Sequence, residues 1–517
     1  MKRIGKFVLN GIMMTVCALL MRTVAMGFNV YVANTAGAEA VGLYSLLSSV
    51  YGFAVTLALS GLHLAVTRLV SEALAVNNKE AVAKVMRKCF VYAITFGTLS
   101  MLLLFFFSKT SADYWLGDIR AEKPLKILAF CLPLISVSSV INGYFSAVRR
   151  VYKSAVSQLC EMAIKIIATV SLFSLILKRN AELACILLVC GSAVSELSIF
   201  IINIILYLYD RLIHFKRKSY RFGPHNEKES VSRAILGISL PIALTSYVRS
   251  ALLSLEHSLI PKGLQKFGND RSSALASYGT LSSMALPVIN FPYALIGSFS
   301  SLLIPEVAEC RARGENRHVR YIAYRTYQSG ISFAVCVFGI FFLFAAPLGN
   351  LMYSSNDAAL YIKWLAPLVP IMYTDSVTDA ILKGMGEQFY AMKVNIADAF
   401  ISVFLVYFLV PIYGIYGYIA TIYIAEIINA SLSILRMIKV TGLRPPIIKF
   451  LLCPLVCTAG ATSVCNILGN TIIDLDSITG LISGMILYIA IYLIALFCIG
   501  GLSRDDVTWL KNVFSKK

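Results

Sequence analysis

Charged side chains inside long apolar segments are the residues of this sequence whose types and spacing could do chemistry. Arg22 and Arg249 each lie within a run of apolar residues, and Glu256 follows Arg249 by seven residues, which places both on one face of a helix. A charge near the centre of a bilayer costs several kcal/mol, so each such residue predicts a functional role. An arginine that lines a cavity suits an anionic ligand, because its planar guanidinium matches phosphate oxygens and keeps its charge when it is desolvated.

His63 and Arg68 extend this set more weakly, because a lone histidine on an apolar helix more often packs than binds. For Arg22 the alternative is a structural arginine that supports neighbouring helices, and for Arg249 it is a locally neutralised pair. The candidate substrate-binding residues are therefore Arg22, Arg249, Arg68, His63 and Glu256. Their chemistry predicts an anionic or amphipathic ligand, and two arginines on separate segments would suit a diphosphate.

Four acidic residues in later apolar segments are candidates for ion or proton coupling. Asp375 and Asp379 are four residues apart on one helix face, have like charges, and have no evident local partner in the sequence. Two adjacent carboxylates repel each other and require a proton or a cation. With Asp398 and Glu426 they form the predicted ion-coupling set. The alternative is that bases from other helices neutralise them or that they lie near the membrane interface.

No residue pattern indicates an enzyme, a metal site or a cofactor. The sequence has no GxxxxGK[ST] phosphate loop, no HExxH and no GxSxG, and its 12 cysteines include no CxxC pair. Glu161 and Lys165 have the spacing of a helical ion pair, which favours a structural role. We therefore expect no enzymatic activity and no cofactor. The candidate driving forces for transport are Na⁺, H⁺ and the membrane potential.

The composition places the chain in a membrane. Of its 517 residues, 58% are hydrophobic and 14% are charged, whereas a soluble globular protein has about 25% charged residues. This excludes an ordinary soluble enzyme, a disordered chain and a disulfide-rich secreted domain. About fourteen apolar runs, each long enough to cross a bilayer as a helix, predict an all-α polytopic membrane protein. The predicted spans are 8–33, 42–67, 89–108, 125–148, 154–177, 183–209, 234–260, 273–304, 322–346, 358–382, 390–411, 414–436, 447–467 and 478–501.

The positions of the basic residues predict the orientation of these spans. The formal net charge is +19, from 46 Lys and Arg against 27 Asp and Glu. With the N-terminus inside, about 33 of the 46 basic residues fall in cytoplasmic segments and about 10 in outer segments. An even number of spans returns the C-terminus to the cytoplasm. The charge therefore indicates a multi-pass protein of the cell membrane with both termini cytoplasmic, and no nucleic-acid partner.

Landmark residues recur in the two halves of the chain at nearly constant separation. Pro133 and Pro367 open spans four and ten. Three pairs of acidic residues recur at almost the same separation, namely Glu72 and Glu309, Glu161 and Asp398, and Glu196 and Glu426. Chance matching of leucine-rich helices is the alternative to a repeat. The repeat predicts two six-helix lobes related by a parallel pseudo-two-fold, with two C-terminal helices outside it. The boundaries are 1–209 for the N-lobe, 210–233 for a basic cytoplasmic linker, 234–440 for the C-lobe and 441–517 for spans thirteen, fourteen and the tail.

Several motifs resemble those of the stage V sporulation protein B family and the related lipid II flippases. Segment 58–88 begins with ALSGLHLAVTRLVSEA, segment 286–311 contains LLIPE, and Pro411 with Gly414 and Gly417 matches a P-x-x-G-I-x-G turn. Residues 142–147 depart from the family pattern, reading NGYFSA in place of RGYFQG. The resemblance covers essentially the whole chain. It implies the multidrug/oligosaccharidyl-lipid/polysaccharide exporter superfamily, two six-helix lobes, and a cavity arginine, matched by Arg22, for a lipid diphosphate.

The expected function is alternating-access flipping of an undecaprenyl-diphosphate-linked oligosaccharide or peptidoglycan precursor. The predicted partners are this lipid-linked sugar, membrane lipids and, as candidates, envelope-assembly proteins. A cation-coupled drug or metabolite antiporter of the same superfamily is the first alternative. It would require an acidic cavity, whereas Arg22 and Arg249 are basic. A non-transporting scaffold for envelope assembly is the second, and it predicts that the cavity charges are dispensable.

Overall fold

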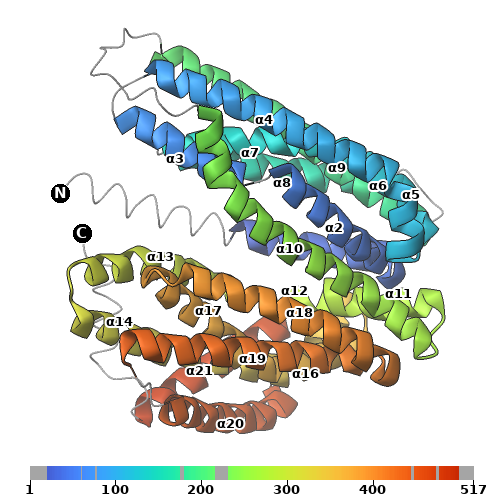
Figure 1. Cartoon of the computed structure of the whole chain (residues 1–517). Helices are drawn as coiled ribbons and strands as arrows, with labels where there is room; N and C mark the ends of the chain where they lie inside the picture. Colours follow the sequence, from blue (N-terminus) through green and yellow to red (C-terminus); the bar gives the residue numbers. More distant parts are fainter. Residues whose placement is uncertain are drawn as a thin grey trace. The chain divides into compact units, whose positions relative to one another are not determined.

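The computed structural model describes residues 20–59, 61–75, 79–148, 150–174, 180–215, 231–443, 447–472 and 477–499. Every regular element in these ranges is a helix, which confirms the predicted all-α fold (Figure 1). Within the described part, nine helices are long and apolar enough to cross a membrane, or ten if one bent pair counts as a single span. The predicted spans overlap helices, or helices in series, in the described residues, and residues 8–19 of span one lie outside them.

Contacts between Cα atoms divide the chain into two compact units, Ala36–Ala276 and Met1–Thr35 with Ser277–Lys517, which we call the N-unit and the C-unit. The N-unit helices are α2 (Ala38–Leu59), α3 (Leu62–Ala75), α4 (Lys79–Phe106), α5 (Ser108–Thr110), η1 (Ser111–Leu116), η2 (Ile119–Ala121), α6 (Glu122–Ala129), α7 (Leu132–Ala147), α8 (Val151–Ser174), α9 (Ala181–Phe215) and α10 (Val231–Lys266). Helix α11 (Arg271–Gly279) crosses the boundary between the units.

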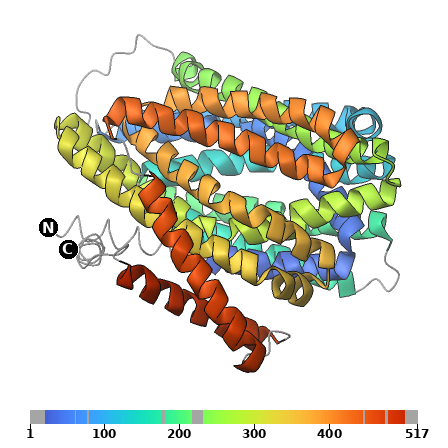
Figure 2. The same ribbon diagram turned by 90° about the horizontal axis from the view of Figure 1, so that it is seen from below.

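The C-unit begins with a helix over residues 20–36 and continues after α11. Its other helices are η3 (Thr280–Ala285), α12 (Leu286–Asn290), α13 (Tyr293–Ala312), α14 (Asn316–Leu343), α15 (Ala345–Tyr353), α16 (Asn356–Leu365), η4 (Ala366–Leu368), α17 (Val369–Gly384), α18 (Gln388–Tyr413), α19 (Ile415–Thr441), α20 (Ile447–Ile472) and α21 (Ile478–Cys498). Figure 2 shows α20 and α21 as a crossed pair beside α14, where the Tyr492 hydroxyl donates to the Ser332 carbonyl at 2.8 Å.

The unit boundaries differ from the predicted lobes, 1–209 and 234–440, because each unit contains the first span of the other half. Helix α10 packs on α2 and α3, and the Thr56 hydroxyl of α2 donates to the Ser250 hydroxyl of α10 at 3.1 Å. Asn34, from the helix over residues 20–36, donates its side-chain amide to the Met352 carbonyl of α15 at 2.8 Å. Most of the predicted linker, residues 216–230, lies outside the described residues, and helices continue into both of its ends.

Several predicted spans are broken helices rather than continuous ones. Span two divides into α2 and α3 at Gly61, whose φ is +70°. A side chain at Gly61 would also meet the Ser239 carbonyl of α10 at 2.9 Å, so the break lets α10 approach closely. Span four bends by 45° between α6 and α7, just before Pro133. Proline lacks an amide donor and clashes with the preceding turn, which explains the position of this bend.

Irregular backbone positions of the first half of the chain recur in the second half at a fixed distance in sequence. This distance is the number of residues from Phe107 to Phe344, and we call it the repeat separation. Both phenylalanines interrupt the helix after a long span, with ψ near zero at 6° and 16°. At the same separation, Gly117 and Ser354 are both left-handed. The residues that follow them, Asp118 and Ser355, both cap a helix through the side chain. The backbone therefore supports the repeat that the polar residues indicated.

Side-chain contacts between equivalent helices repeat as well. Ser136 of α7 donates to the Ala58 carbonyl at 3.0 Å. Tyr373, at the repeat separation from Ser136 on α17, donates to the Ile289 carbonyl at 3.0 Å. In both units a side chain on the second half of a broken span thus holds a neighbouring helix by its backbone.

Helices α15 and α16 approach each other closely because position 349 lacks a side chain. A Cβ at Gly349 would overlap the backbone and Cβ of Ala359, and helix backbone cannot move aside as a flexible side chain can. We expect Gly349→Ala to destabilise the protein by about 1–3 kcal/mol, the usual cost of overpacking. Gly460→Ala in α20 meets nothing within 4 Å and is the matched control. Thermal unfolding in detergent should show a lower midpoint for the first variant only; equal midpoints would contradict this packing.

Candidate functional site

Arg22 lies on the helix over residues 20–36, and its side chain is exposed in the C-unit. No described residue forms a hydrogen bond or close ion pair with it. It lies within electrostatic range of the Tyr373 hydroxyl on α17. Tyr373 is fully buried and its ring lies against those of Tyr293 and Phe333, with centroids 5.5 and 6.1 Å away. The guanidinium is therefore available to an anionic ligand beside a rigid aromatic cluster.

The other predicted substrate-binding residues lie in the N-unit. Arg249 on α10 is exposed, whereas Glu256 on the same helix is 8% exposed. His63 and Arg68 are exposed on α3, and Arg68 forms an ion pair with Glu72 at 2.9 Å between Nε and Oε1. Arg68 thus has a local partner that neutralises its charge. Of the predicted bases in this unit, Arg249 is the stronger candidate.

Arg22 and Arg249 occupy related positions in the repeat. Each helix ends at a glycine with positive φ, Gly37 and Gly268. Measured back from these glycines, the two arginines differ in position by four residues. Four residues are about one helical turn, so the two arginines lie on equivalent faces of the two helices.

Three of the predicted coupling residues come together in the C-unit. Asp375 on α17, Asp398 on α18 and Glu426 on α19 lie within electrostatic range of one another and are half-buried. Asp375 accepts a hydrogen bond from the buried Ser433 hydroxyl, while its buried Oδ1 has no partner among the described residues. We call Asp375, Asp398 and Glu426 the acidic cluster.

Asp379, the fourth predicted coupling residue, has a partner that the sequence reading missed. Lys383, four residues further on α17, lies 3.1 Å from its Oδ2. The expectation that Asp375 and Asp379 have no local partner is therefore wrong for Asp379. Lys383 directly follows the predicted end of span ten at residue 382, and its spacing from Asp379 is that of a helical ion pair.

The N-unit has a counterpart of the acidic cluster that contains a base. Glu161 on α8 and Glu196 on α9 lie within electrostatic range of each other and of Lys165. Although Glu161 and Lys165 are both described, no close ion pair joins them, so the predicted local pair is not formed. At the repeat separation, Ser138 replaces Asp375 and Lys165 replaces Ser402. The C-unit therefore holds three acids where the N-unit holds two acids and a lysine.

A second polar site, which the sequence did not reveal, closes one end of the N-unit. The carboxylate of Asp210 on α9 is fully buried and accepts from Lys153 of α8 at 2.5 Å and from Tyr144 of α7 at 2.9 Å. Arg150 also pairs with it. Its partners are 57–66 residues away in sequence, so no local spacing indicated them. We call this group the Asp210 network.

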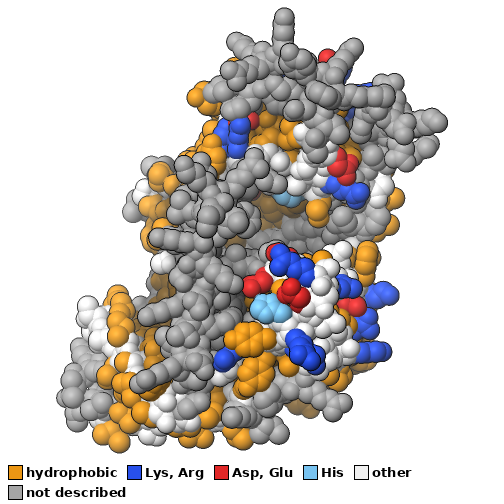
Figure 3. Space-filling model, turned by 90° about the vertical axis from the view of Figure 1, so that its left-hand side faces the viewer, with side chains coloured by type: hydrophobic (Ala, Val, Ile, Leu, Met, Phe, Trp, Pro, Cys, Tyr) orange, Lys and Arg blue, Asp and Glu red, His pale blue; other side chains and the backbone are white. Residues whose placement is uncertain are grey.

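The C-unit has the corresponding interaction with the signs exchanged. Glu387 and Tyr390 stand at the repeat separation from Arg150 and Lys153. Arg436 of α19 donates to Glu387 at 2.8 Å and lies 5.0 Å from the centroid of the Tyr390 ring. In each unit an ion pair therefore joins the fifth and sixth spans of the repeat. These spans are α8 and α9 in the N-unit and α18 and α19 in the C-unit. Figure 3 looks at the ends of the helices, where basic and acidic side chains gather.

A polar cluster at the other end of the N-unit fixes α10 and α11 to the turn around η1. The buried Asp118 side chain pairs with Arg120 at 2.8 Å and with Arg271 at 3.0 Å. Arg120 also reaches Glu39 at 2.8 Å, and Lys262 donates to the Tyr114 carbonyl. These charges are mutually paired and are interpreted as structural. Among the described residues, no three His, Cys, Asp or Glu side chains are placed to hold a metal ion.

The Asp210 network should be needed for stability rather than for binding. We expect Asp210→Asn to destabilise the protein by about 3–5 kcal/mol, because Arg150 and Lys153 would keep their charges in a largely buried site without a counter-ion. Glu72→Gln, which breaks the exposed pair with Arg68, should cost at most about 1 kcal/mol. Thermal unfolding of purified protein in detergent measures both. Equal loss in the two variants would show that burial of Asp210 carries no special weight.

Comparison with known proteins relates this arrangement to a family. The family described as polysaccharide biosynthesis protein matches residues 7–261. Stage V sporulation protein B of Bacillus subtilis (strain 168) is 27% identical over 413 residues, covering 77% of this chain and 77% of that protein. Lipid II flippase MurJ of the same organism is 22% identical over 394 residues, covering 71% of this chain and 69% of that protein.

A solved structure of lipid II flippase MurJ in the inward closed conformation has the same fold. It matches with a TM-score of 0.70 and 14% identity, over 94% of this chain and 98% of that chain. Together with the helices of membrane-spanning length, these matches confirm the resemblance seen in the motifs. This chain is a multi-pass membrane protein whose sequence is similar to that of stage V sporulation protein B and whose fold is that of the solved lipid II flippase MurJ.

Proposed function

We propose that this membrane transporter flips an undecaprenyl-diphosphate-linked oligosaccharide or peptidoglycan precursor across the cell membrane by alternating access. The observation that carries the proposal is the exposed Arg22 beside Tyr373. A guanidinium in a transmembrane helix is costly unless it binds an anion, and a lipid diphosphate is an anion that remains in the membrane. The relative named lipid II flippase MurJ acts on a substrate of this kind and supports the proposal.

Coupling of this binding site to a driving force would run through α17. Tyr373 and Asp375 are two residues apart on α17, which puts them on opposite faces of the helix. One face is near Arg22 and the other is in the acidic cluster. Binding of a proton or a cation by the acidic cluster would remove repulsion among the three carboxylates and shift α17 between two packings. We propose H⁺ or Na⁺ as the coupling ion, with both chain termini at the cytoplasmic face.

The role of Arg22 can be tested with reconstituted protein. A charge-assisted hydrogen bond contributes about 1.5–3 kcal/mol, so Arg22→Ala should lower flipping of a fluorescent undecaprenyl-diphosphate sugar in liposomes by about tenfold to a hundredfold. Arg22→Lys, which keeps the charge but not the planar fork, should retain part of the activity. Lys393→Ala removes an exposed charge on α18 and is the control.

Two results would count against this proposal. Unaltered lipid translocation by Arg22→Ala would remove Arg22 from the substrate site. Absence of translocation by the wild-type protein, combined with efflux of cationic drugs, would favour the antiporter alternative of the same superfamily.

The acidic cluster makes a separate prediction about energy coupling. Asp375→Asn is nearly isosteric, yet it lowers the number of ionisable groups in the cluster. We expect flipping by this variant to lose its response to an imposed H⁺ or Na⁺ gradient, while the wild-type rate rises with the correct gradient. Asp357→Asn removes an exposed acid from the first turn of α16 and serves as the control. An unchanged gradient response in Asp375→Asn would exclude Asp375 as a coupling residue.

A further inference from the structure

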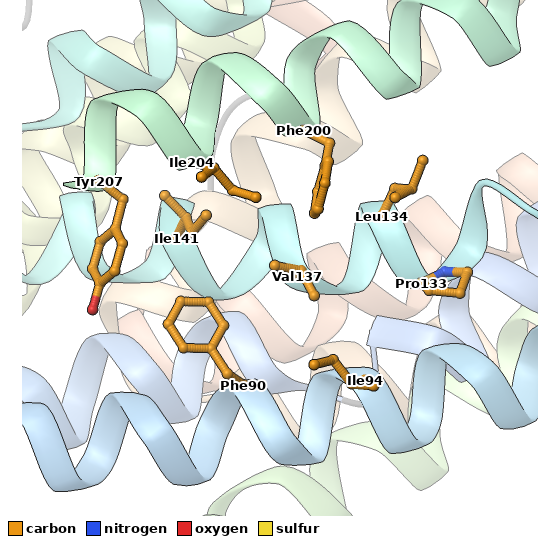
Figure 4. A pocket seen from close by; sticks show the side chains of 9 residues that line it. All are labelled: Phe90, Ile94, Pro133, Leu134, Val137, Ile141, Phe200, Ile204 and Tyr207. Carbon is orange, nitrogen blue, oxygen red and sulfur yellow. The ribbon is translucent and has the colours of Figure 1, made fainter. Parts of the chain in front are cut away.

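An apolar groove runs along α7 in the N-unit, between α4 and α9. It has a volume of about 400 Å³, within the range of ligand pockets. Eight of the nine side chains that line it are purely apolar, and the ninth is Tyr207. Figure 4 shows Tyr207 at one end of the groove, Ile141 and Phe90 facing each other next to it, Val137 in the middle, and Pro133 at the other end. Ile141 is fully buried and forms the floor.

The groove lies on the membrane-facing part of these helices. Helices α4 and α9 are spans by length and hydropathy, and α7 belongs to the bent span. Ile94 at the rim is 51% exposed, and Ile201 and Ile205 beside the groove on α9 are 47% and 59% exposed. Exposed side chains of this kind on a transmembrane helix face lipid. The groove is therefore open to the acyl chains of the surrounding lipids.

Basic side chains stand at the end of the groove that Phe90 and Tyr207 line. Arg87 precedes Phe90 by three residues on α4, and Arg211 follows Tyr207 by four residues on α9, so both stand on the helix faces that line the groove. Both side chains are exposed. Arg211 lies within electrostatic range of Tyr207. The nearby Asp210 does not neutralise them, because its charge is taken by Arg150 and Lys153.

The length of the groove fits one leaflet. Pro133 and Ile141 are eight residues apart on α7, or about 12 Å at about 1.5 Å per residue. Half of a hydrocarbon core is about 15 Å thick. An acyl chain of a phospholipid spans one leaflet, whereas an undecaprenyl chain is several times longer than this groove.

We propose that this groove is a binding site for an anionic bilayer phospholipid. One acyl chain lies along α7 between Phe90 and Pro133, and the phosphate lies between Arg87 and Arg211. Basic sites between transmembrane helices on the predicted cytoplasmic side are suited to anionic headgroups. The site is built from the N-unit alone, so it does not depend on the substrate or the coupling proposed above.

The test uses the purified full-length protein and measures lipid binding by native mass spectrometry. Dioleoylphosphatidylglycerol should bind more tightly than dioleoylphosphatidylcholine, with one lipid retained at the lowest concentrations. An arginine near a charged lipid contributes about fivefold in affinity, so the double variant Arg87→Ala, Arg211→Ala should bind phosphatidylglycerol about 25-fold more weakly. Its affinity for phosphatidylcholine should fall much less, because the choline cation offsets the charge of the phosphate.

Two further variants separate the groove from general surface charge. Lys88→Ala removes an exposed base from α4 two residues before Phe90, on the side of the helix away from the groove, and should leave binding unchanged. Val137→Trp fills the middle of the groove and should abolish the tight binding of phosphatidylglycerol. Circular dichroism and size-exclusion chromatography check that this variant folds, and Val137→Leu provides a milder version.

Three results would overturn the inference. These are equal binding of the two phospholipids, an equal loss in Lys88→Ala and the double arginine variant, and displacement of phosphatidylglycerol by stoichiometric undecaprenyl phosphate. The last result would assign the groove to the isoprenoid chain of a substrate. A flipping assay of the double arginine variant is independent of this test and does not decide it.

Discussion

A charged side chain inside a membrane-spanning helix must either form an ion pair or bind a ligand. This requirement accounts for the positions of the polar residues in both units. Asp210 shares its buried carboxylate among two bases and a tyrosine, and Glu387 pairs with Arg436 in the C-unit. Such sites stabilise the contacts between helices. Arg22 and Asp375 are different, since neither has an ion-pair partner among the described residues. The functional proposals rest on these exceptions.

The two units share a backbone pattern but differ in charge. The helix interruptions, the left-handed residues and the capping side chains recur at the repeat separation, so the two folds satisfy the same geometric demands. At corresponding positions the N-unit has Ser138 and Lys165, and the C-unit has Asp375 and Ser402. Two units with the same fold and different charged residues can carry out different parts of the function. The acidic cluster therefore has three acids and no base in the C-unit, whereas Lys165 accompanies the two acids at the equivalent place in the N-unit.

The sequence predicted the helices well because hydropathy over about 20 residues is a strong signal, and the repeat was visible because polar residues are rare in these spans. It did not predict the Asp210 network, since Asp210 lies 57 residues from Lys153 and only packing brings them together. The Asp379–Lys383 pair has the spacing of a helical ion pair, but Lys383 lies just beyond the predicted end of span ten at residue 382. The first span of each half belongs to the unit formed by the other half, and no local sequence pattern indicated this.

Helix α17 is the element in which these constraints meet. It follows the interruption at η4 and carries Pro370 near its start, so fewer backbone hydrogen bonds tie it to α16 than a continuous helix would have. It packs against α13, α14 and α19. One face of α17 lies near Arg22 and the other holds Asp375, so an anion bound at Arg22 and a proton bound at Asp375 would both act on this one helix.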